Sequence, residues 1–295
     1  MRLALGDRVV ECEEGRPLLM GIVNANPDSF SDAARLATLE DQVAHALAQV
    51  RAGADLIDVG GESGVTYTGL TAEEVEIGRV LPLVRALVAA GVTVSVDTFK
   101  PAVAAAALEA GAAMVNDVSG LADPELARLC ARSGAALVVM HTRAAPKQAH
   151  FPAYADVVGD VESFLREAMV RARAEGVRDD QLVVDPGPDF AKRPGESVEV
   201  LRALPRLRAL GRPVLAAVSR KYFLGAVTGR PPDQRLGASV AAALWAARAG
   251  AAILRVHDVA DVADALAVDR VLRGEAEVPE VDDGDDGLKW IREES

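Results

Sequence analysis

The sequence has 295 residues, of which half are hydrophobic and only 4% aromatic, and its net charge is −12. This acidic balance argues against a general binder of nucleic acid or anionic membranes, and no run approaches the roughly 20 apolar residues of a membrane span. Because Cys12 and Cys130 are the only cysteines and lack any ligand spacing, we expect two reduced thiols in a soluble, cytoplasmic protein.

Residues 2–11 predict a short β-hairpin, and from residue 18 onward short apolar runs alternate with Ala/Leu-rich amphipathic stretches. Continuous apolar runs of this length are typical of strands buried on both faces, whereas the stretches between them have helical spacing. Helices are expected, for example, at residues 41–52, 102–110 and 197–210. In chain order the predicted strands are "LLMGIVN", "DLIDVGGE", "TVSVDT", "AMVNDV", "ALVVMH", "LVVDPG", "VLAAVSRK" and "ILRVHD".

Eight strand–helix units in succession predict an α/β fold, a (β/α)8 TIM barrel of residues 1–273, with the hairpin closing its bottom. A doubly wound open sheet is the competing architecture. Its first turn normally carries a Gly-x-Gly-x-x-Gly phosphate loop, and "MGIVNANPDSF" is not one. Residues 274–295 are acidic with little apolar content, so we expect a disordered tail there.

Polar residues stand where each predicted strand ends. In a (β/α)8 barrel the carboxyl ends of the strands form the active-site mouth. The residues at these ends are Asn24, Asp58 with Glu62, Asp97, Asn116 with Asp117, His141, Asp185, the trio Ser219, Arg220 and Lys221, and Arg255 with His257. A structural barrel does not need a polar side chain at every mouth position, so we expect a ligand site here, with some of these residues capping the next helix.

Two kinds of group are expected to meet at this mouth. Carboxylates and an amide from the middle strands suit a flat ligand edge rich in N–H donors, and cations follow the last two strands, the usual phosphate site of the fold. The first set is Asp97, Asn116 and Asp185, and the second is Arg220, Lys221, Arg255 and His257. Together they predict a polar heterocycle bound at one end and a phosphate or diphosphate at the other.

Some of these residues also have a structural interpretation. Asp185 precedes Pro186 and Gly187 and could simply start a turn, although the apolar run before it favours a ligand contact. We expect Asn116 to contact the ligand and Asp117 to be structural. For His141, the sequence favours a supporting role and a direct substrate contact equally.

Seven segments, in order and at matching spacing, resemble the dihydropteroate synthase family along essentially the whole chain up to about Gly274. The segments are "MGIVNANPDSFSD", "GADLIDVGGES", "TVSVDTFKPAVAAAALEAGAAMVNDVSG", "VVMH", "VVDPGPDFAK", "SRKYFLG" and "RVHDV". The resemblance implies a transferase of folate biosynthesis. In this family p-aminobenzoate displaces diphosphate from 6-hydroxymethyl-7,8-dihydropterin diphosphate, with Mg²⁺, to give 7,8-dihydropteroate, by a displacement that is thought to be SN1-like.

The resemblance also implies a role for each residue that matches a family motif. The pterin would be held by Asp97, Asn116, Asp185 and Lys221, of which Asp97, Asp185 and Lys221 would be catalytic. The diphosphate would bind to Asn24, Arg255 and His257, with Mg²⁺ on Asn24, and p-aminobenzoate would lie beside Ser63, Phe190 and Arg220. The family usually forms homodimers through its last helices, and "LGASVAAALWAARAGAA" is apolar enough for that contact.

The second loop departs from the family pattern. Where the family normally has Gly-Glu-Ser-Thr-Arg-Pro-Gly, this chain has Gly64, Val65 and Thr66 in place of Thr-Arg-Pro. Val65 cannot supply the charge-assisted bonds of the missing guanidinium. Asp189, directly before Phe190, is a smaller departure that is expected to add a negative charge beside the aminobenzoate site.

Several functions are therefore compatible with the sequence. The first is an active dihydropteroate synthase, with altered affinity for p-aminobenzoate and sulfonamides. The second is a related transferase that uses another nucleophile, and the third is a pterin-binding paralogue with little or no turnover. A corrinoid methyltransferase domain that binds methyl-tetrahydrofolate is more remote, because that chemistry has no diphosphate for Arg255 and His257 to hold.

Overall fold

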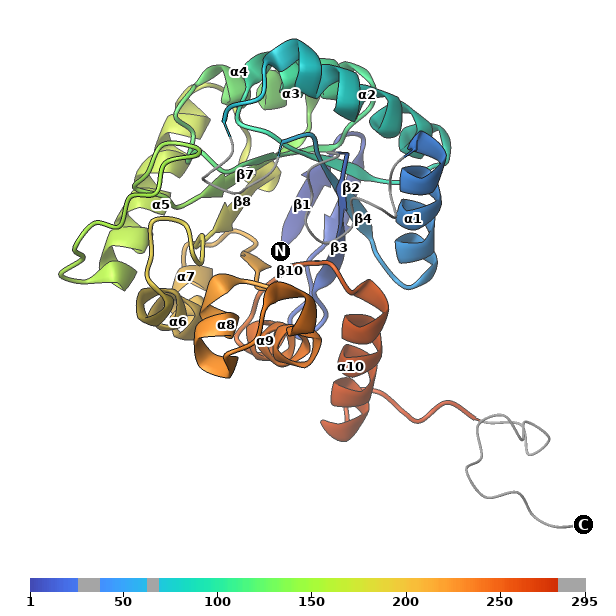
Figure 1. Cartoon of the computed structure of the whole chain (residues 1–295), viewed down its shortest axis with the longest axis vertical. Helices are drawn as coiled ribbons and strands as arrows, with labels where there is room; N and C mark the ends of the chain where they lie inside the picture. Colours follow the sequence, from blue (N-terminus) through green and yellow to red (C-terminus); the bar gives the residue numbers. More distant parts are fainter. Residues whose placement is uncertain (26–37, 63–68, 281–295) are drawn as a thin grey trace, which may run out of the picture.

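Eight parallel strands surrounded by helices form the centre of the structure, a computed structural model that describes residues 1–25, 38–62 and 69–280 (Figure 1). The strands are β3 (Leu18–Asn24), β4 (Leu56–Gly60), β5 (Val94–Asp97), β6 (Met114–Asp117), β7 (Ala136–Met140), β8 (Leu182–Asp185), β9 (Leu215–Ala217) and β10 (Ile253–Val256). Each lies within one of the predicted apolar runs, so all eight strand predictions are confirmed.

The sheet closes on itself. Its strand order is β8-β7-β6-β5-β4-β3-β10-β9, and every neighbouring pair is parallel. A parallel bridge between Val184 and Val214 joins the two ends, and the Val184 N–H donates to the Pro213 carbonyl over 3.0 Å. The predicted (β/α)8 barrel is therefore confirmed, and the open doubly wound sheet is excluded.

The predicted hairpin is also confirmed, and it closes one end of the barrel. Its strands are β1 (Arg2–Leu5) and β2 (Arg8–Glu11), paired antiparallel. Leu3 and Leu5 of β1 belong to a buried cluster with Met20, Leu56 and Met114. These three residues lie near the amino-terminal ends of β3, β4 and β6. The amino-terminal end of the barrel is thus filled with apolar side chains, and the carboxyl-terminal end remains for a ligand.

The helices pack around the outside of the strands (Figure 1). They are α1 (Leu39–Arg51), α2 (Glu73–Ala89), α3 (Pro101–Glu109), α4 (Glu125–Ser133), α5 (Val157–Ala174), α6 (Pro194–Arg202), α7 (Leu204–Arg208), α8 (Tyr222–Thr228), α9 (Leu236–Arg248) and α10 (Val259–Leu272), with 3-10 turns η1 (Asp179–Gln181) and η2 (Pro232–Gln234). The core between helices and strands consists mainly of Val, Leu and Ala side chains, as the low aromatic content predicts.

One helix prediction is wrong in its extent. The helix expected at residues 197–210 is divided into α6 and α7, with Ala203 between them. Pro205, in the first turn of α7, has no N–H to donate and its ring would clash with the carbonyl four residues earlier in a continuous helix. The helices expected at residues 41–52 and 102–110 are confirmed within two residues at each end, as α1 and α3.

The last helix, α10, ends at Leu272, next to the predicted end of the barrel. Residues 276–280 have no helix, strand or turn, and the rest of the predicted acidic tail lies outside the described residues. Among the helices of the described residues, none is both long and apolar enough to span a membrane.

Candidate active site

The alternation of side chains along the strands places the predicted site residues inside the barrel. Met20, Leu56, Met114 and Ile253 point into the apolar cluster below. Because side chains alternate with a period of two, residues two or four positions later on the same strands face the same interior, closer to the carboxyl ends. These later residues are Asn24, Asp58, Asn116 and Arg255.

Three predicted residues lie at one level of the barrel. Strand register pairs Asn24 with Gly60, Gly60 with Asp97, and Asp97 with Asn116. A Cβ atom on Gly60 would lie 3.6 Å from Asn24 Oδ1 and 3.7 Å from Asp97 Cβ. The missing side chain therefore leaves a small recess between the Asn24 amide and the Asp97 carboxylate.

Asp58, one of the polar residues predicted at the strand ends, precedes Gly60 by two residues on β4 and so lies one layer deeper than this level. Its Oδ2 accepts from Arg255 Nε over 2.6 Å and from Asn116 Nδ2 over 3.1 Å, and its side chain is completely buried. Arg255 Nη2 also donates to Asp97 Oδ2 over 2.8 Å. Three predicted residues, Asp97, Asn116 and Arg255, are thus brought together around the carboxylate of Asp58, a strand-end residue for which the sequence predicted no particular contact.

Burial shapes the ionisation of this cluster. It raises the pKa of Asp97 to about 7; Arg255 opposes the shift, and the nearby Asp58 carboxylate adds to it. For Arg255, burial lowers the pKa, but Asp58 and Asp97 more than compensate, so the pKa lies above its ordinary value. A permanently charged guanidinium therefore sits at the mouth beside a carboxyl group that titrates near neutral pH.

Asp185 and Lys221 complete the predicted pterin set. Asp185 is 3% exposed, and its Oδ1 accepts from the Gly187 N–H over 2.7 Å. The turn-forming interpretation of Asp185 is thus correct, and its other oxygen remains for a ligand. Burial raises the pKa of Asp185, which Lys221 partly offsets, and burial lowers the pKa of Lys221, which Asp189 and then Asp185 partly offset.

The predicted aminobenzoate side contains a stacked pair. Lys221 Nζ lies 4.4 Å from the centroid of the Phe190 ring, a cation–π distance. Arg220, which was expected here, directs its guanidinium to Asp258, with Nη2 2.7 Å from Oδ1. Ser63, the remaining residue predicted for this side, lies outside the described residues, as do Gly64 to Thr68 of the altered loop.

His257 lies among cations and is neutral. Burial, with Arg220, Arg255 and Lys221 nearby, lowers its pKa to about 3. Its Nδ1 is 2.9 Å from Ser219 Oγ, so the diphosphate contact predicted for His257 would fall to Nε2. The four predicted cationic groups of the last two strands are thus close enough to influence one another.

His141 has a supporting role in this structure. It is completely buried, with Nε2 2.9 Å from Asp160 Oδ2 and Nδ1 2.7 Å from Lys192 Nζ. Because the ionised Asp160 carboxylate can only accept, Nε2 carries the proton of a neutral ring and Nδ1 accepts from Lys192. Burial lowers the pKa of His141 to about 3, which agrees with a neutral ring.

Lys192 is a residue that sequence reasoning missed. Its Nζ also donates to the carbonyls of Gly187 and Phe190, over 2.9 and 3.0 Å. Burial lowers its pKa to about 7. Lys192 therefore holds the loop that carries Phe190 against His141. Its position at the end of the family segment "DPGPDFAK" could have indicated a role at the site.

The negative charge predicted for Asp189 does act beside the aminobenzoate site, since it is the charge that most strongly raises the pKa of Lys221, and its oxygens also bind backbone and side-chain donors. Its Oδ2 accepts from the Tyr222 N–H over 2.5 Å and its Oδ1 from Ser197 Oγ over 3.1 Å. The carboxylate therefore serves the first N–H groups of α8, which helix geometry leaves without partners. Asp117 has the structural role that was expected, because its oxygens accept from the N–H groups of Ser119 and Leu121.

A buried ion cluster flanks the altered second loop. Lys100 Nζ donates to Glu62 and Glu76, each over 2.5 Å, and to the Thr71 carbonyl over 2.6 Å. Glu62 directly precedes the residues outside the structure and Thr71 closely follows them. The sequence placed Glu62 at a strand end, but its ion pair with Lys100 and the part played by Glu76 were not predicted.

The hard oxygen donor best placed for a metal ion is Asn24 Oδ1, beside the recess at Gly60. Within residues 1–25, 38–62 and 69–280, no group of three His, Cys, Asp or Glu side chains could enclose a metal ion. A metal at this mouth would therefore depend on oxygens of a bound ligand.

The chain matches the pterin binding enzyme family over residues 20–257. The dihydropteroate synthase of Mycobacterium leprae is 44% identical over 259 residues, covering 85% of this chain and 91% of that protein. Two solved structures of the Xanthomonas albilineans dihydropteroate synthase superpose on this fold. The structure with 4-aminobenzoic acid has a TM-score of 0.85 at 44% identity and covers 94% of this chain and 99% of that one. The complex with 7,8-dihydropteroate has a TM-score of 0.83 at 43% identity, with coverages of 95% and 100%.

Proposed function

This chain belongs to the dihydropteroate synthase family of pterin-binding enzymes, and we propose that it joins 6-hydroxymethyl-7,8-dihydropterin diphosphate to p-aminobenzoate. The products are 7,8-dihydropteroate and diphosphate. The similar Xanthomonas albilineans enzyme binds 4-aminobenzoic acid in one structure and 7,8-dihydropteroate in another. These are the second substrate and the product of the proposed reaction.

The observation that carries the proposal is the polar level of the barrel interior. Asp97 and Asn116 are register partners, and Asp185 and Lys221 influence each other's pKa at the same mouth. Carboxylates and an amide suit the amino-pyrimidine edge of a pterin, and Lys221 suits its ring carbonyl. A buried site of this kind rejects a ring without those donors, because its own groups would be left unpaired.

The same residues fit the proposed chemistry. The bond between the exocyclic carbon and the diphosphate oxygen breaks, its electron pair leaves on the diphosphate, and the amine nitrogen then forms the new bond and loses a proton. Carboxylates beside the pterin, Asp97 and Asp185, would stabilise the positive charge that develops on the ring and its exocyclic carbon. Catalysis of this kind requires the carboxylates to be fixed before reaction, and the register and the turn bond of Asp185 hold them in place.

Arg255 can bind the diphosphate leaving group while it keeps its hydrogen bonds to Asp58 and Asp97. A guanidinium has five N–H donors, of which one on Nε serves Asp58 and one on Nη2 serves Asp97. The remaining donors could take diphosphate oxygens. His257 Nε2 would add a further donor, and a bound anion would raise the low pKa of its ring toward protonation.

Mg²⁺ fits this mouth through Asn24. One amide oxygen beside an open recess, together with phosphate oxygens and water, is an ordinary set of ligands for this ion. When bound, Mg²⁺ would neutralise charge on the leaving diphosphate. Chelation should abolish product formation and added Mg²⁺ should restore it, whereas full activity in the presence of a chelator would contradict this assignment.

The second substrate would lie against Phe190 and Lys221. The aromatic ring offers a stacking surface, and the ammonium suits a carboxylate. The altered loop, in which Val65 stands where the family has Arg, favours one alternative: a transferase that keeps the pterin diphosphate and uses another nucleophile.

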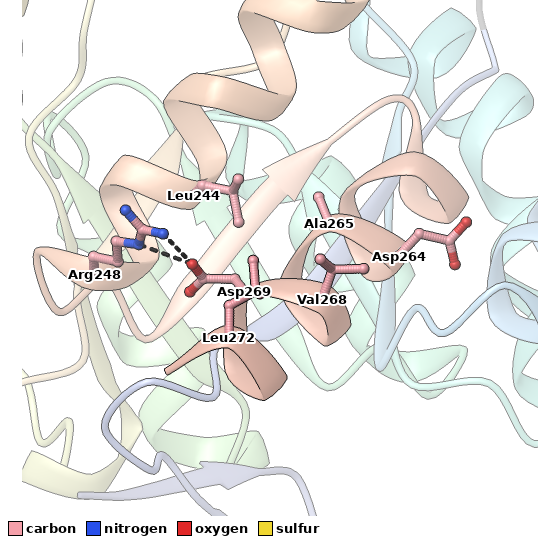
Figure 2. Close-up of a pocket in the computed structure, with 7 residues that line it drawn as sticks. All are labelled: Leu244, Arg248, Asp264, Ala265, Val268, Asp269 and Leu272. Atoms are coloured by element: carbon pink, nitrogen blue, oxygen red, sulfur yellow. Dashed lines mark hydrogen bonds and ion pairs between the residues drawn. The ribbon is translucent and has the colours of Figure 1, made fainter. Parts of the chain in front are cut away.

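We also propose that the chain forms a homodimer through α9 and α10. Trp245 of α9 is 54% exposed, and Val268 and Leu272 of α10 are 59% and 80% exposed. Figure 2 shows the surface pocket between these helices, of about 370 Å³, with Leu244, Val268 and Leu272 beside the Arg248–Asp269 ion pair. Neighbouring exposed apolar side chains of this kind are typical of protein–protein contacts, and a second copy would cover them.

Light scattering tests the dimer with matched variants. Val268→Lys should convert the dimer to monomer, because it places a charge in the apolar lining of the pocket between α9 and α10. Val170→Lys, at a valine of α5 that is 62% exposed, is the control and should leave the dimer intact. A monomeric wild-type protein would contradict the proposal.

Diphosphate release tests the reaction and its nucleophile. With the pterin diphosphate and Mg²⁺ present, the proposal predicts release that rises with p-aminobenzoate and saturates. Release that does not depend on p-aminobenzoate would favour the alternative nucleophile. Tight pterin binding without any release of diphosphate would contradict both transferase reactions and indicate a pterin-binding paralogue without turnover.

A further inference from the structure

Three residues with left-handed backbone surround the Phe190–Lys221 pair. Asp189 has φ 68° and Ala191 has φ 51°, on either side of Phe190, and Arg220, directly before Lys221, has φ 56°. Side chains other than glycine rarely adopt this region, which persists only where the surroundings hold it. The backbone that presents both members of the pair is therefore held in place by specific contacts.

At two of these three residues, a side chain from another segment of the chain holds the backbone in place. The Ala191 carbonyl accepts from the Tyr154 hydroxyl over 3.0 Å. The Arg220 N–H donates to Ser239 Oγ of α9 over 2.9 Å. Asp189 is different, because its own side chain makes the contacts that hold it.

The Asp189 carboxylate connects the Phe190 loop directly to α8. Besides the Tyr222 N–H, it accepts from the Phe223 N–H over 3.3 Å. Buried Ser197 of α6 donates to it and accepts from the Asp189 N–H over 2.9 Å. Lys221, the N-cap residue of α8, makes no side-chain capping bond of its own, so the cap is supplied by Asp189, which is 33 positions before Tyr222.

The two ends of this contact adjoin the stacked pair. Asp189 immediately precedes Phe190, and Tyr222 immediately follows Lys221. A bond of 2.5 Å between Asp189 Oδ2 and the Tyr222 N–H therefore limits how far Phe190 and Lys221 can separate. We propose that Asp189 is a positioning residue that fixes the spacing between Phe190 and Lys221 and so sets the affinity for an aromatic amine that carries a carboxylate. This inference rests on the proposed function, because it concerns the second-substrate side of the same site.

Steady-state kinetics of Asp189→Ala test the role. The KM for p-aminobenzoate should rise about tenfold, equivalent to about 1.4 kcal/mol of binding free energy, because the contact that holds Phe190 beside Lys221 is lost. The KM for the pterin diphosphate, which Lys221 also helps to bind, should rise less than the KM for p-aminobenzoate, because Asp97, Asn116 and Asp185 still hold the pterin. Asp189→Asn, which keeps one acceptor oxygen, should recover part of the affinity and also guards against a failure of the alanine variant to fold.

Asp123→Ala provides a matched control. Asp123 accepts from the Glu125 N–H over 2.9 Å at the start of α4, so its loss also removes a carboxylate from the start of a helix. It should leave the KM for p-aminobenzoate unchanged. An equal rise in both variants would mean that general destabilisation, and not the position of Phe190, weakens binding, and would overturn the inference.

Amide hydrogen exchange separates this inference from the proposed function. The Tyr222 and Phe223 amides should exchange at least tenfold faster in Asp189→Ala than in the wild type, whether or not the enzyme turns over. Unchanged exchange would overturn the contact itself, and faster exchange with an unchanged KM would overturn its role in affinity. A wild-type protein that does not use p-aminobenzoate would overturn the proposed function, and with it the substrate named here, while the exchange data would still decide whether Asp189 holds α8.

Discussion

Replacing Asp58 with asparagine should destabilise the protein more than any other single charge removal at the mouth. Asp58 is fully buried, and one of its oxygens receives both Arg255 Nε, at 2.6 Å, and Asn116 Nδ2, at 3.1 Å. The asparagine keeps the shape and one acceptor, so the packing is preserved. What is lost is the negative charge that compensates a buried guanidinium.

The size of the effect follows from this geometry. Removing one partner of a buried ion pair typically costs about 3–5 kcal/mol, because the other charge remains buried without compensation. Asp97 still accepts from Arg255 over 2.8 Å, which places the expected loss near the lower end of that range. We therefore expect the free energy of unfolding to fall by about 3 kcal/mol. Asp97→Asn should cost less, because the Asp97 side chain is 26% exposed and water can compensate.

Urea unfolding followed by circular dichroism measures this loss, provided that the transition is two-state and its slope is unchanged. Glu277→Gln removes the same charge from an exposed position and should change the stability by less than about 0.5 kcal/mol. A loss for Asp58→Asn that is no larger than this control would refute the argument that Asp58 compensates Arg255.

Three further predictions concern ligands and pH. Asp185→Asn should weaken pterin binding by about 10- to 100-fold in calorimetry, the worth of a hydrogen bond to a charged group, and a normal affinity would remove Asp185 from the site. Because burial raises the pKa of Asp97 to about 7 and only the ionised carboxylate accepts both ring donors, pterin affinity should rise from pH 6 to pH 8, and Asp97→Asn should abolish that rise. His257→Ala should weaken the diphosphate-bearing pterin about tenfold and leave the pterin alcohol within about twofold. Since the folded pKa of His257, about 3, lies below its ordinary value of 6.5, neutral His257 contributes stability that is present above pH 6.5 and lost as the pH falls toward 3. The alanine variant should therefore lose less stability on acidification, and an equal loss would contradict the assignment.

Local features of the sequence were sufficient for the barrel. Each apolar run ends in a polar residue, and the period of two along a strand fixes which residues face the interior, so Asn24, Asp97, Asn116 and Arg255 could be placed at one mouth without coordinates. The division of α6 from α7 was missed, although Pro205 was a local signal for it.

Contacts between distant residues could not be read in the same way. Asp58 and Arg255 are separated by 197 residues, and nothing local indicates that their side chains meet. The capping role of Asp189 could not be predicted, because its partners, the N–H groups of α8, become known only when two loops are brought side by side. Lys192 and Lys100 were missed for the same reason, since each is defined by acceptors on other elements.

The most direct test of the proposed function is to identify the product. The purified wild-type protein is mixed with 6-hydroxymethyl-7,8-dihydropterin diphosphate, Mg²⁺ and isotope-labelled p-aminobenzoate, and the mixture is analysed by mass spectrometry. We expect labelled 7,8-dihydropteroate to accumulate with one diphosphate per product, and to be nearly absent with Asp185→Asn. Diphosphate release without the labelled product, from a protein that binds the pterin, would contradict the proposal that p-aminobenzoate is the nucleophile.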